Sequence, residues 1–183
     1  NAVAISGTTA QVTAALVTAG TLVEVTDAAV TIDDTPTIAE LNAIAAKTTG
    51  VVTATLAANS LANLGALTTA GTDVITITVN DADAAELTAA DLSTLGGRTA
   101  GTVTVTNAVA ITGSTAQATA ALVTAGSLVE VSDATVTIND ADGSALNAED
   151  LSAIGNKTTG TVTVTNAVAI SGTTAQVTAA LVT

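Results

Sequence analysis

The residues with the clearest chemical potential are aspartates gathered in three short turns, each rich in side-chain oxygens. Such turns can hold Ca²⁺, which takes about six to eight oxygen ligands. We therefore predict that any bound calcium is held by Asp81, Asp83, Asp140 and Asp142. The three turns are Asp33-Asp34, Asn80-Asp81 with Asp83, and Asn139-Asp140 with Asp142 and Gly143.

A simpler interpretation of the same turns needs no metal. Asp and Asn favour turns because their side chains hydrogen-bond to nearby backbone groups. The segment from Asp140 to Gly143 resembles the opening of a calcium loop, but no acid follows it at the spacing of an EF-hand. Both interpretations, a solvated turn between strand and helix and a calcium site, stay open at this point.

The composition disfavours catalysis. The chain has no His and no Cys, so it lacks the commonest general base and the thiolate metal ligand. No glycine-rich loop ends in the Lys-Ser/Thr pair of a P-loop. The acidic turns also recur along the chain, whereas an enzyme normally builds one specialised site. We expect neither an enzyme nor a small-molecule substrate, and no cofactor other than the calcium considered above.

Charge and hydropathy exclude two further classes of partner. Three basic residues stand against 16 acidic ones, which gives a net charge of −13. This charge repels nucleic acids and anionic membrane surfaces. Mean hydropathy is +0.62, yet Thr, Gly or Asp interrupts every apolar run before the ~18 residues that a membrane span needs.

The chain repeats itself. Residues 166–183 are identical to residues 1–18, so the period is 165 residues, and a near-copy begins at Asn107. We interpret residues 1–183 as one repeat segment, a slice of a longer protein or fibre. Alignment on the Gly before each Val-rich stretch divides one period into six coils. These run over 51–71, 72–101, 102–126, 127–160, 161 onward through the equivalent of 1–20, and 21–50.

Each coil is predicted to open with a strand. Between 103 and 111, Val, Asn and Ile alternate with Thr and Ala in a period of two. One strand there would place Asn107 inward, with its equivalents Asn1 and Asn166 and with Asp27 and Asp133 aligned in neighbouring coils as a ladder. The alternative is that the strand bends at Asn107 and its side chain caps the turn.

Each coil is then predicted to turn into a short helix. Thr37, Thr88 and Asn147 are the expected N-caps, each with an acid three residues later: Glu40, Asp91 and Asp150. Thr8 with Gln11 and Ser114 with Gln117 have the same spacing. Hydrophobic staples are expected between Leu87 and Leu92 and between Leu146 and Leu151, with Pro36 at the corresponding position of a third coil.

The ends of the helices carry a second pattern. Lys47, Arg98 and Lys157 occupy one slot, each followed by Thr, then Thr or Ala, then Gly. A cation there complements the helix dipole, and Gly permits a tight exit into the next strand. We expect three helices to end at these basic residues, and the other two capped helices to end at Gly20 and Gly126.

Two segments carry a resemblance to a known group. Residues 92–105, LSTLGGRTAGTVTV, and residues 147–160, NAEDLSAIGNKTTG, resemble repeats of very large bacterial surface proteins, notably cyanobacterial ones. Such repeats often stand beside calcium-binding nonapeptide repeats, whose G-G-x-G-x-D signature this chain lacks. The resemblance implies an extracellular or cell-surface location.

Together these patterns predict an α/β solenoid, with a parallel sheet along one side, short helices along the other and right-handed crossovers. The expected function is structural: a fibre, filament, surface layer or stalk in which copies join end to end. The alternative is a binding module, either a calcium-loaded adhesin stalk or an ice-binding array of threonines. Glu24 and Glu130 interrupt the expected threonine rows.

Overall fold

The computed structural model describes residues 3–18, 20 and 23–181. Within them strands and helices alternate in chain order, and every strand pair is parallel. The helices are α1 (Thr9–Leu16), α2 (Ile38–Ala45), α3 (Leu61–Leu64), α4 (Ala89–Gly96), α5 (Thr115–Leu122), α6 (Ala148–Gly155) and α7 (Thr174–Leu181), with a 3-10 turn η1 (Ala125–Ser127). None of these helices has the length and apolar run that a membrane crossing requires.

The strands form three parallel sheets that do not close into a barrel. The largest has the order β1 (Ala4–Gly7), β2 (Ala29–Ile32), β3 (Val52–Thr55), β4 (Val74–Val79), β6 (Val103–Val105) and β8 (Val129–Glu130). The second has the order β11 (Val162–Val164), β9 (Thr135–Ile138), β7 (Ala110–Gly113) and β5 (Glu86–Thr88). The third pairs β10 (Ala145–Asn147) with β12 (Ala169–Ser171).

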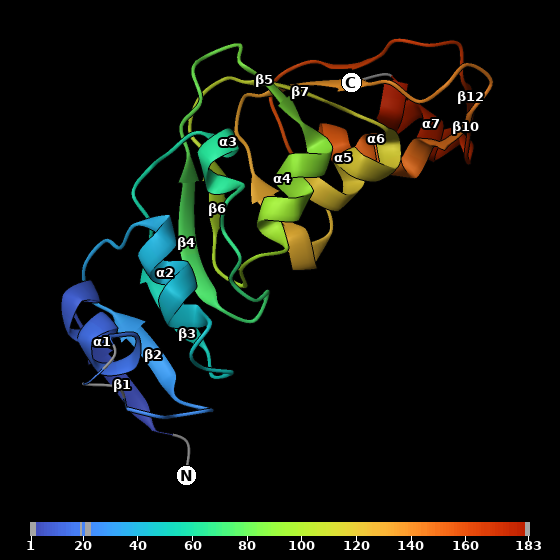
Figure 1. The fold of residues 1–183 in the computed structure, drawn as a ribbon. Coiled ribbons are helices and arrows are strands. Elements are labelled where there is room, and N and C mark those ends of the chain that lie inside the picture. Colours follow the sequence, from blue (N-terminus) through green and yellow to red (C-terminus); the bar gives the residue numbers. More distant parts are fainter. Residues whose placement is uncertain (1–2, 19, 21–22, 182–183) are drawn as a thin grey trace.

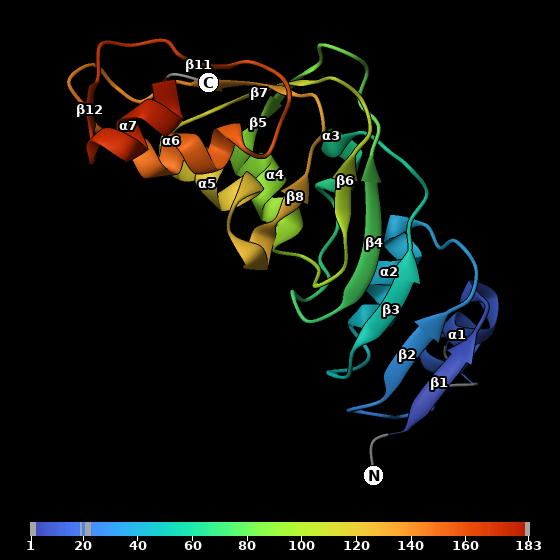
Figure 2. The ribbon, with the colours of Figure 1, turned by 180° about the vertical axis from the view of Figure 1, so that it is seen from behind.

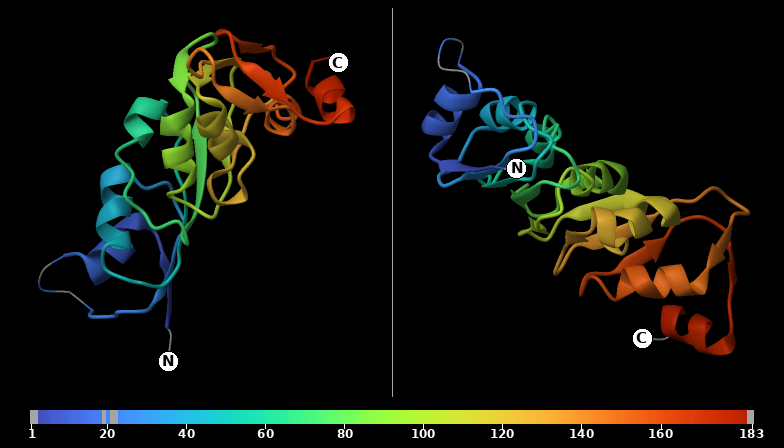
Figure 3. Two further views of the ribbon diagram at one scale, coloured as in Figure 1. Left: turned by 90° about the vertical axis from the view of Figure 1, so that its right-hand side faces the viewer. Right: turned by 90° about the horizontal axis from the view of Figure 1, so that it is seen from below.

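Within each sheet the strands follow one another in chain order. Helices α1 and α2 cover one face of the β1–β4 region, as views from opposite sides show (Figures 1 and 2). Elements β1 and α7 lie at opposite ends of the molecule (Figure 3). Strand β4 joins two parts of the largest sheet, because β3 pairs with its residues 74–76 and β6 with its residues 77–79.

The core is made of small branched side chains from both kinds of element. In β4, Ile75, Ile77 and Val79 are fully buried while the threonines between them face outward, as the period of two predicts. The predicted staple residues Leu87, Leu92, Leu146 and Leu151 are buried too. One hydrophobic cluster runs through the described residues from Val12 in α1 to Ile154 in α6, so the coils share a continuous core.

Four of the predicted N-caps are confirmed with their predicted partners. Thr8, Thr37 and Ser114 form capping boxes with Gln11, Glu40 and Gln117, and Thr88 accepts from the N–H of Asp91 at 3.0 Å. Asn147 is an N-cap, but its partner was predicted wrongly: Asn147 Oδ1 accepts from the N–H of Glu149 at 3.0 Å, not from Asp150.

The prediction of one strand from 103 to 111 is wrong. The chain forms β6 and β7, which belong to different sheets, and it bends at Asn107 between them. The ladder of inward side chains is also absent from the described residues, because Asp27, Asp133 and Asn166 are exposed; Asn1 lies outside the described residues. The prediction failed because the alternation of side-chain types continues through the bend. Asn at position 107 fits a turn as well as a polar position in a strand.

The predicted helix ends were too late. Helices α2, α4 and α6 end two residues before Lys47, Arg98 and Lys157, and the three basic residues follow the C-cap with exposed side chains. Helices α1 and α5 end at Leu16 and Leu122, four residues before Gly20 and Gly126. After α1 and α5 the apolar C-cap residues Val17 and Val123 extended the apparent helical pattern.

Candidate functional site

The acidic turns bind the coil that precedes each of them. Asp140 Oδ2 accepts from both the N–H and the hydroxyl of Thr115, the first residue of α5, at 2.7 Å each. Asp34 Oδ1 accepts from the same two groups of Thr9, the first residue of α1. Asp81 Oδ2 accepts from the N–H of Leu61, the first residue of α3, at 2.7 Å. Every second helix therefore receives an N-terminal carboxylate from the next coil.

This arrangement is electrostatically favourable. The first N–H groups of a helix have no partner within the helix, and the helix dipole makes this end partly positive. A carboxylate placed there makes charge-assisted hydrogen bonds. Accordingly, the hydroxyl and the N–H of Thr9 hold the pKa of Asp34 below its ordinary value. The contact joins two coils that are otherwise held together by sheet pairing and the core.

Two of the turns also bind the coil that follows. Asp83 Oδ1 accepts from the N–H of Ala108 at 3.1 Å, and Asn107 Nδ2 donates to the carbonyl of Asp81 at 2.6 Å. The alternative of a bend at Asn107 is thus confirmed. Its side chain, however, binds the backbone of the preceding coil, a contact that the sequence did not predict.

The same geometry recurs one unit further along the chain. There Asp142 Oδ1 accepts from the N–H of Ala167 at 3.0 Å, and Asn166 Nδ2 donates to the carbonyl of Asp140 at 2.6 Å. Each Asn-Asp-x-Asp turn thus connects the coil before it to the coil after it.

A different role, calcium binding, was predicted for the same side chains. Asp81, Asp83, Asp140 and Asp142 each use one carboxylate oxygen to accept backbone N–H groups. Among the residues that the structure describes, no three acidic side chains gather closely enough to hold a metal ion. Calcium binding at these four residues stays a prediction, whereas the turn contacts are directly visible.

A contact within three of the coils involves the Thr that follows each basic residue, which sequence reasoning did not single out. Thr48 donates its hydroxyl to the carbonyl of Ala28 at 2.6 Å and accepts from the N–H of Gly50 at 2.9 Å. Thr99 and Thr158 do the same with Ile75 and Ala134 as acceptors. The recurring Lys/Arg-Thr-x-Gly motif was the signal present in the sequence. The Thr directly after the basic residue is the member of the motif that makes these hydrogen bonds.

The Gly of this motif is required by close packing. A Cβ on Gly50, Gly101 or Gly160 would overlap the carbonyl oxygen of the residue, earlier in the same coil, that accepts the Thr hydroxyl. None of the three has a positive φ. The predicted tight exit is therefore a close approach of two backbones and not a left-handed turn.

Asp73 is a buried acid that sequence reasoning missed. It is 4 % exposed, and its two oxygens accept from the N–H of Val52 at 2.8 Å and of Ala70 at 2.9 Å. A buried carboxylate needs such partners, because an unpaired one is costly. Asp73 thus repeats the theme of the turns: an acidic oxygen satisfies the backbone of a neighbouring coil.

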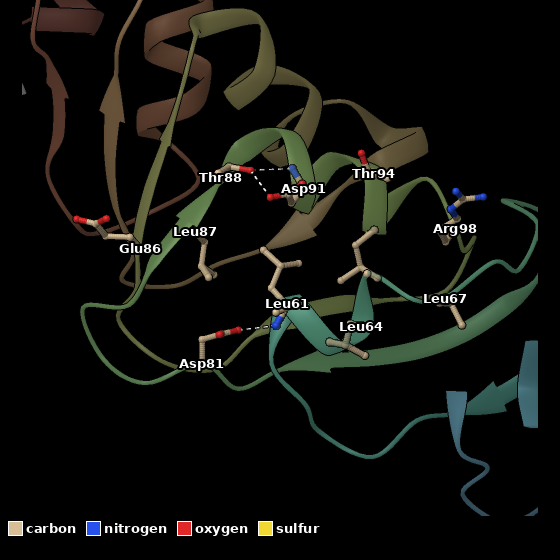
Figure 4. A pocket seen from close by; sticks show the side chains of 13 residues that line it. Leu61, Leu64, Leu67, Asp81, Glu86, Leu87, Thr88, Asp91, Thr94 and Arg98 are labelled. Atoms are coloured by element: carbon tan, nitrogen blue, oxygen red, sulfur yellow. Dashed lines mark hydrogen bonds between the residues drawn. The ribbon is translucent and has the colours of Figure 1, made fainter. Parts of the chain in front are cut away.

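A groove of 410 Å³ lies between α3 and α4 (Figure 4). It exists because α3 has four residues where α4 has eight. Its floor is formed by buried leucines, and two of its acids already have partners: Asp81 with Leu61 and Asp91 with Thr88. The carboxylates of Asp81 and Asp91 in the groove are thus used within the fold.

Comparison of the chain with protein-family models, with curated proteins and with solved structures found no match. The functional interpretation therefore depends on the geometry described above.

Proposed function

We propose that this chain is a structural module in which strand-helix coils stack as a right-handed α/β solenoid, forming part of an extracellular fibre, surface layer or stalk. The observation that carries the proposal is the repetition of the inter-coil bonds. Asp34 and Asp140 each hold the first residue of the helix in the preceding coil, 25 residues earlier. A side chain used at regular intervals to join neighbours serves assembly and not chemistry.

The distribution of polar groups supports the same function. The aspartates of the acidic turns and Asn107 direct their carboxylate oxygens or amide nitrogen at the backbone of an adjacent coil. Thr48 and Thr99 bind the backbone of their own coil and close it. No single coil could fold alone, because ordering a residue's backbone costs about 1–2 kcal/mol and each coil buries few side chains. Stacking supplies the missing contacts, as in other repeat proteins. The partners of this module are accordingly further copies of itself.

Fibre diffraction or helical reconstruction of the native assembly tests this function. Strands that stack along the axis should give a repeat of ~4.8 Å, and six coils should advance the axis by about 29 Å per period. A monodisperse particle without this repeat would contradict the proposal. Localisation at the cell surface is tested separately by labelling intact cells.

One observation favours a second candidate function, ice binding. Thr88, Thr112, Thr137 and Thr163 lie side by side in the register of the second sheet. In the largest sheet the corresponding row is broken, because Thr104 pairs with Glu130. An ice-recrystallisation assay on the wild type and on Thr112→Lys separates the two functions: a structural module gives no inhibition in either.

A further inference from the structure

Two helices of identical sequence, near opposite ends of the chain, differ in how much of their surface is buried. Helices α1 and α7 have the same sequence, TAQVTAAL. In α1, Thr9, Val12 and Leu16 are buried, whereas α7 has no buried residue. Leu16 is 1 % exposed and its counterpart Leu181 is 59 % exposed. Because the sequence is the same, the difference comes from the neighbours: α1 packs against α2, the helix that follows it, whereas α7 packs against α6, the helix that precedes it.

The strands show the same complementarity. Strand β7, in the middle of the chain, pairs with β5 on one side and β9 on the other. Its equivalents at the two ends each have one partner: β1 pairs with β2, and β12 pairs with β10. The open edge of β12 is therefore the edge that the same residues, as β1, use to bind β2.

A third position fits the pattern. Strands β6 and β11 share the sequence VTV, and β6 pairs with β8 through Val103 and Val129. In the coil of residues 21–50, the residue equivalent to Val129 is Val23, which is 51 % exposed. Strand β11 pairs with β9, and Val162 stands where Val103 stands in β6. Both members of this pair are thus present, at opposite ends of the chain.

We infer that the face formed by β11, β12 and α7 is covered by residues 23–45 of a further copy, so that residues 166–183 of one copy occupy the place of residues 1–18 in the next. This inference rests on the proposed function and specifies the joint between successive copies, by which we mean the contact of β11, β12 and α7 with residues 23–45 of the next copy. Ser171 would lie beside Thr31 of the second copy, as Ser6 does in the register of β1 and β2. The carboxylate of Asp34 in the second copy would hold Thr174, as it holds Thr9.

Exchange of this segment between two molecules preserves the contacts that it makes. Before exchange, β12 contacts β10 in one molecule and β1 contacts β2 in the other. Afterwards a single segment makes both contacts, and the displaced residues 1–18 regain conformational freedom. The pairing of Val162 with Val23 is added. When the second copy belongs to the same chain, no segment is displaced and the joint is identical.

Disulfide trapping between single-cysteine variants tests the joint, because the chain has no cysteine of its own. Ser171→Cys and Thr31→Cys are mixed and oxidised. Neighbouring strands lie ~4.8 Å apart, within the ~4.4–6.8 Å that a disulfide allows between Cα atoms. Thr137→Cys is the matched control: Thr137 holds the position of Thr31 in β9 and is flanked by β7 and β11. Thr31 is flanked by β3 and by β1, and of these four strands only β1 belongs to the displaced segment.

We expect the Ser171–Thr31 heterodisulfide, identified by mass spectrometry, in at least about tenfold excess over the Ser171–Thr137 pair after correction for thiol reactivity. Tenfold corresponds to a modest preference in free energy. A peptide with the sequence of residues 166–183 should suppress the cross-link, because it occupies the same place, and a scrambled peptide should not. Equal yields for the two pairs, or no heterodisulfide, would overturn the inference.

A second variant separates this joint from overall stability. Leu181→Asp changes an exposed side chain, so the melting temperature of the single molecule should not change, while the cross-link should be lost. Leu16→Asp, the same residue in a buried copy, should lower the melting temperature. If fibres keep the ~4.8 Å repeat but Thr31→Cys does not cross-link, the joint is wrong and the stacked fibre stands. If neither is observed, both proposals fail.

Discussion

Asp140 and Thr115 are 25 residues apart in the chain, yet the carboxylate of Asp140 accepts from both the backbone N–H and the hydroxyl of Thr115 at 2.7 Å. This pair joins two successive coils at the N-terminus of a helix. The same relationship between Asp34 and Thr9 shows that it belongs to the repeat and not to one coil.

Removal of this carboxylate should weaken the stack. Asp140→Ala leaves the first N–H of α5 without its partner, so we expect a loss of about 1–3 kcal/mol in the free energy of unfolding. Urea denaturation followed by circular dichroism measures it. Asp133→Ala is the control, because Asp133 is exposed and its hydrogen bond is to its neighbour Ser132 at 3.1 Å. Equal losses in the two variants would show that net charge, and not the inter-coil bond, matters.

The close approach of backbones predicts opposite effects at two glycines. Gly101→Ala places a Cβ against the carbonyl of Ile75, so it should destabilise by about 1–3 kcal/mol through overpacking. Gly155→Ala meets nothing within 4 Å at the end of α6 and should be neutral or stabilising by about 0.5–1 kcal/mol, because Ala is the better helix former. Thermal melts of both variants test the contrast; a tolerated Gly101→Ala would contradict the packing.

Two equivalent turn residues predict a reciprocal pair of substitutions. Gly143 has φ +79° and Ala84, at the same place in the preceding turn, has φ 60°. A side chain in this left-handed region costs about 1–2 kcal/mol, which exceeds the entropy cost of glycine. Ala84→Gly should therefore raise the melting temperature, and Gly143→Ala should lower it. Shifts of the same sign for both would refute this account.

Acid should selectively weaken the first coils. Hydrogen bonds from Thr9 lower the pKa of Asp34 from its ordinary 3.8, and hydrogen bonds from Thr37 lower the pKa of Glu40 from 4.5. A carboxyl group with a lowered folded pKa stabilises the fold above its ordinary value, and this contribution is lost as the pH falls through the folded value.

The wild type should consequently melt at a higher temperature than Asp34→Asn near neutral pH. This difference should shrink once the pH drops below the ordinary 3.8 of Asp34. Melting curves over a pH series measure it. A difference that grows on acidification would have the wrong sign.

Calcium should leave stability unchanged if the turn carboxylates serve only the backbone. A ligand bound to the folded state raises stability by RT ln(1 + [L]/Kd). We expect identical melting curves in millimolar calcium and in excess chelator, because each of the four turn aspartates already bonds to a backbone N–H. A melting temperature raised by calcium, and lost in Asp140→Asn with Asp142→Asn, would establish the metal site instead.

Features that depend on nearby residues could be predicted from the sequence. The capping boxes of Thr8, Thr37 and Ser114 join residues three apart, so their spacing is visible in one dimension. Alternation identified the buried side of β4 for the same reason. The bend at Asn107 was weighed but not favoured, because the residue that it contacts, Asp81, is 26 residues away.

The contacts of the turn aspartates could not be predicted from the sequence. Their clustering and their repetition were evident, and calcium binding was one valid interpretation of oxygen-rich turns. Their contacts with Thr9, Leu61 and Thr115 required the stacking register, which places a turn over the helix of the preceding coil. The Thr of the Lys/Arg-Thr-x-Gly motif was missed because its carbonyl partner lies 20 or 24 residues earlier in the chain.

The sequence by itself determined the local structure of this protein: identical residues form helix α1 at one end and helix α7 at the other. The tertiary structure alone decided which of these residues are buried, since Leu16 is 1 % exposed and Leu181 is 59 % exposed. The physical reason is that helix formation depends on bonds between residues three or four apart. Burial instead depends on which helix and strand lie alongside, and those neighbours are set by the tertiary structure and not by the segment itself.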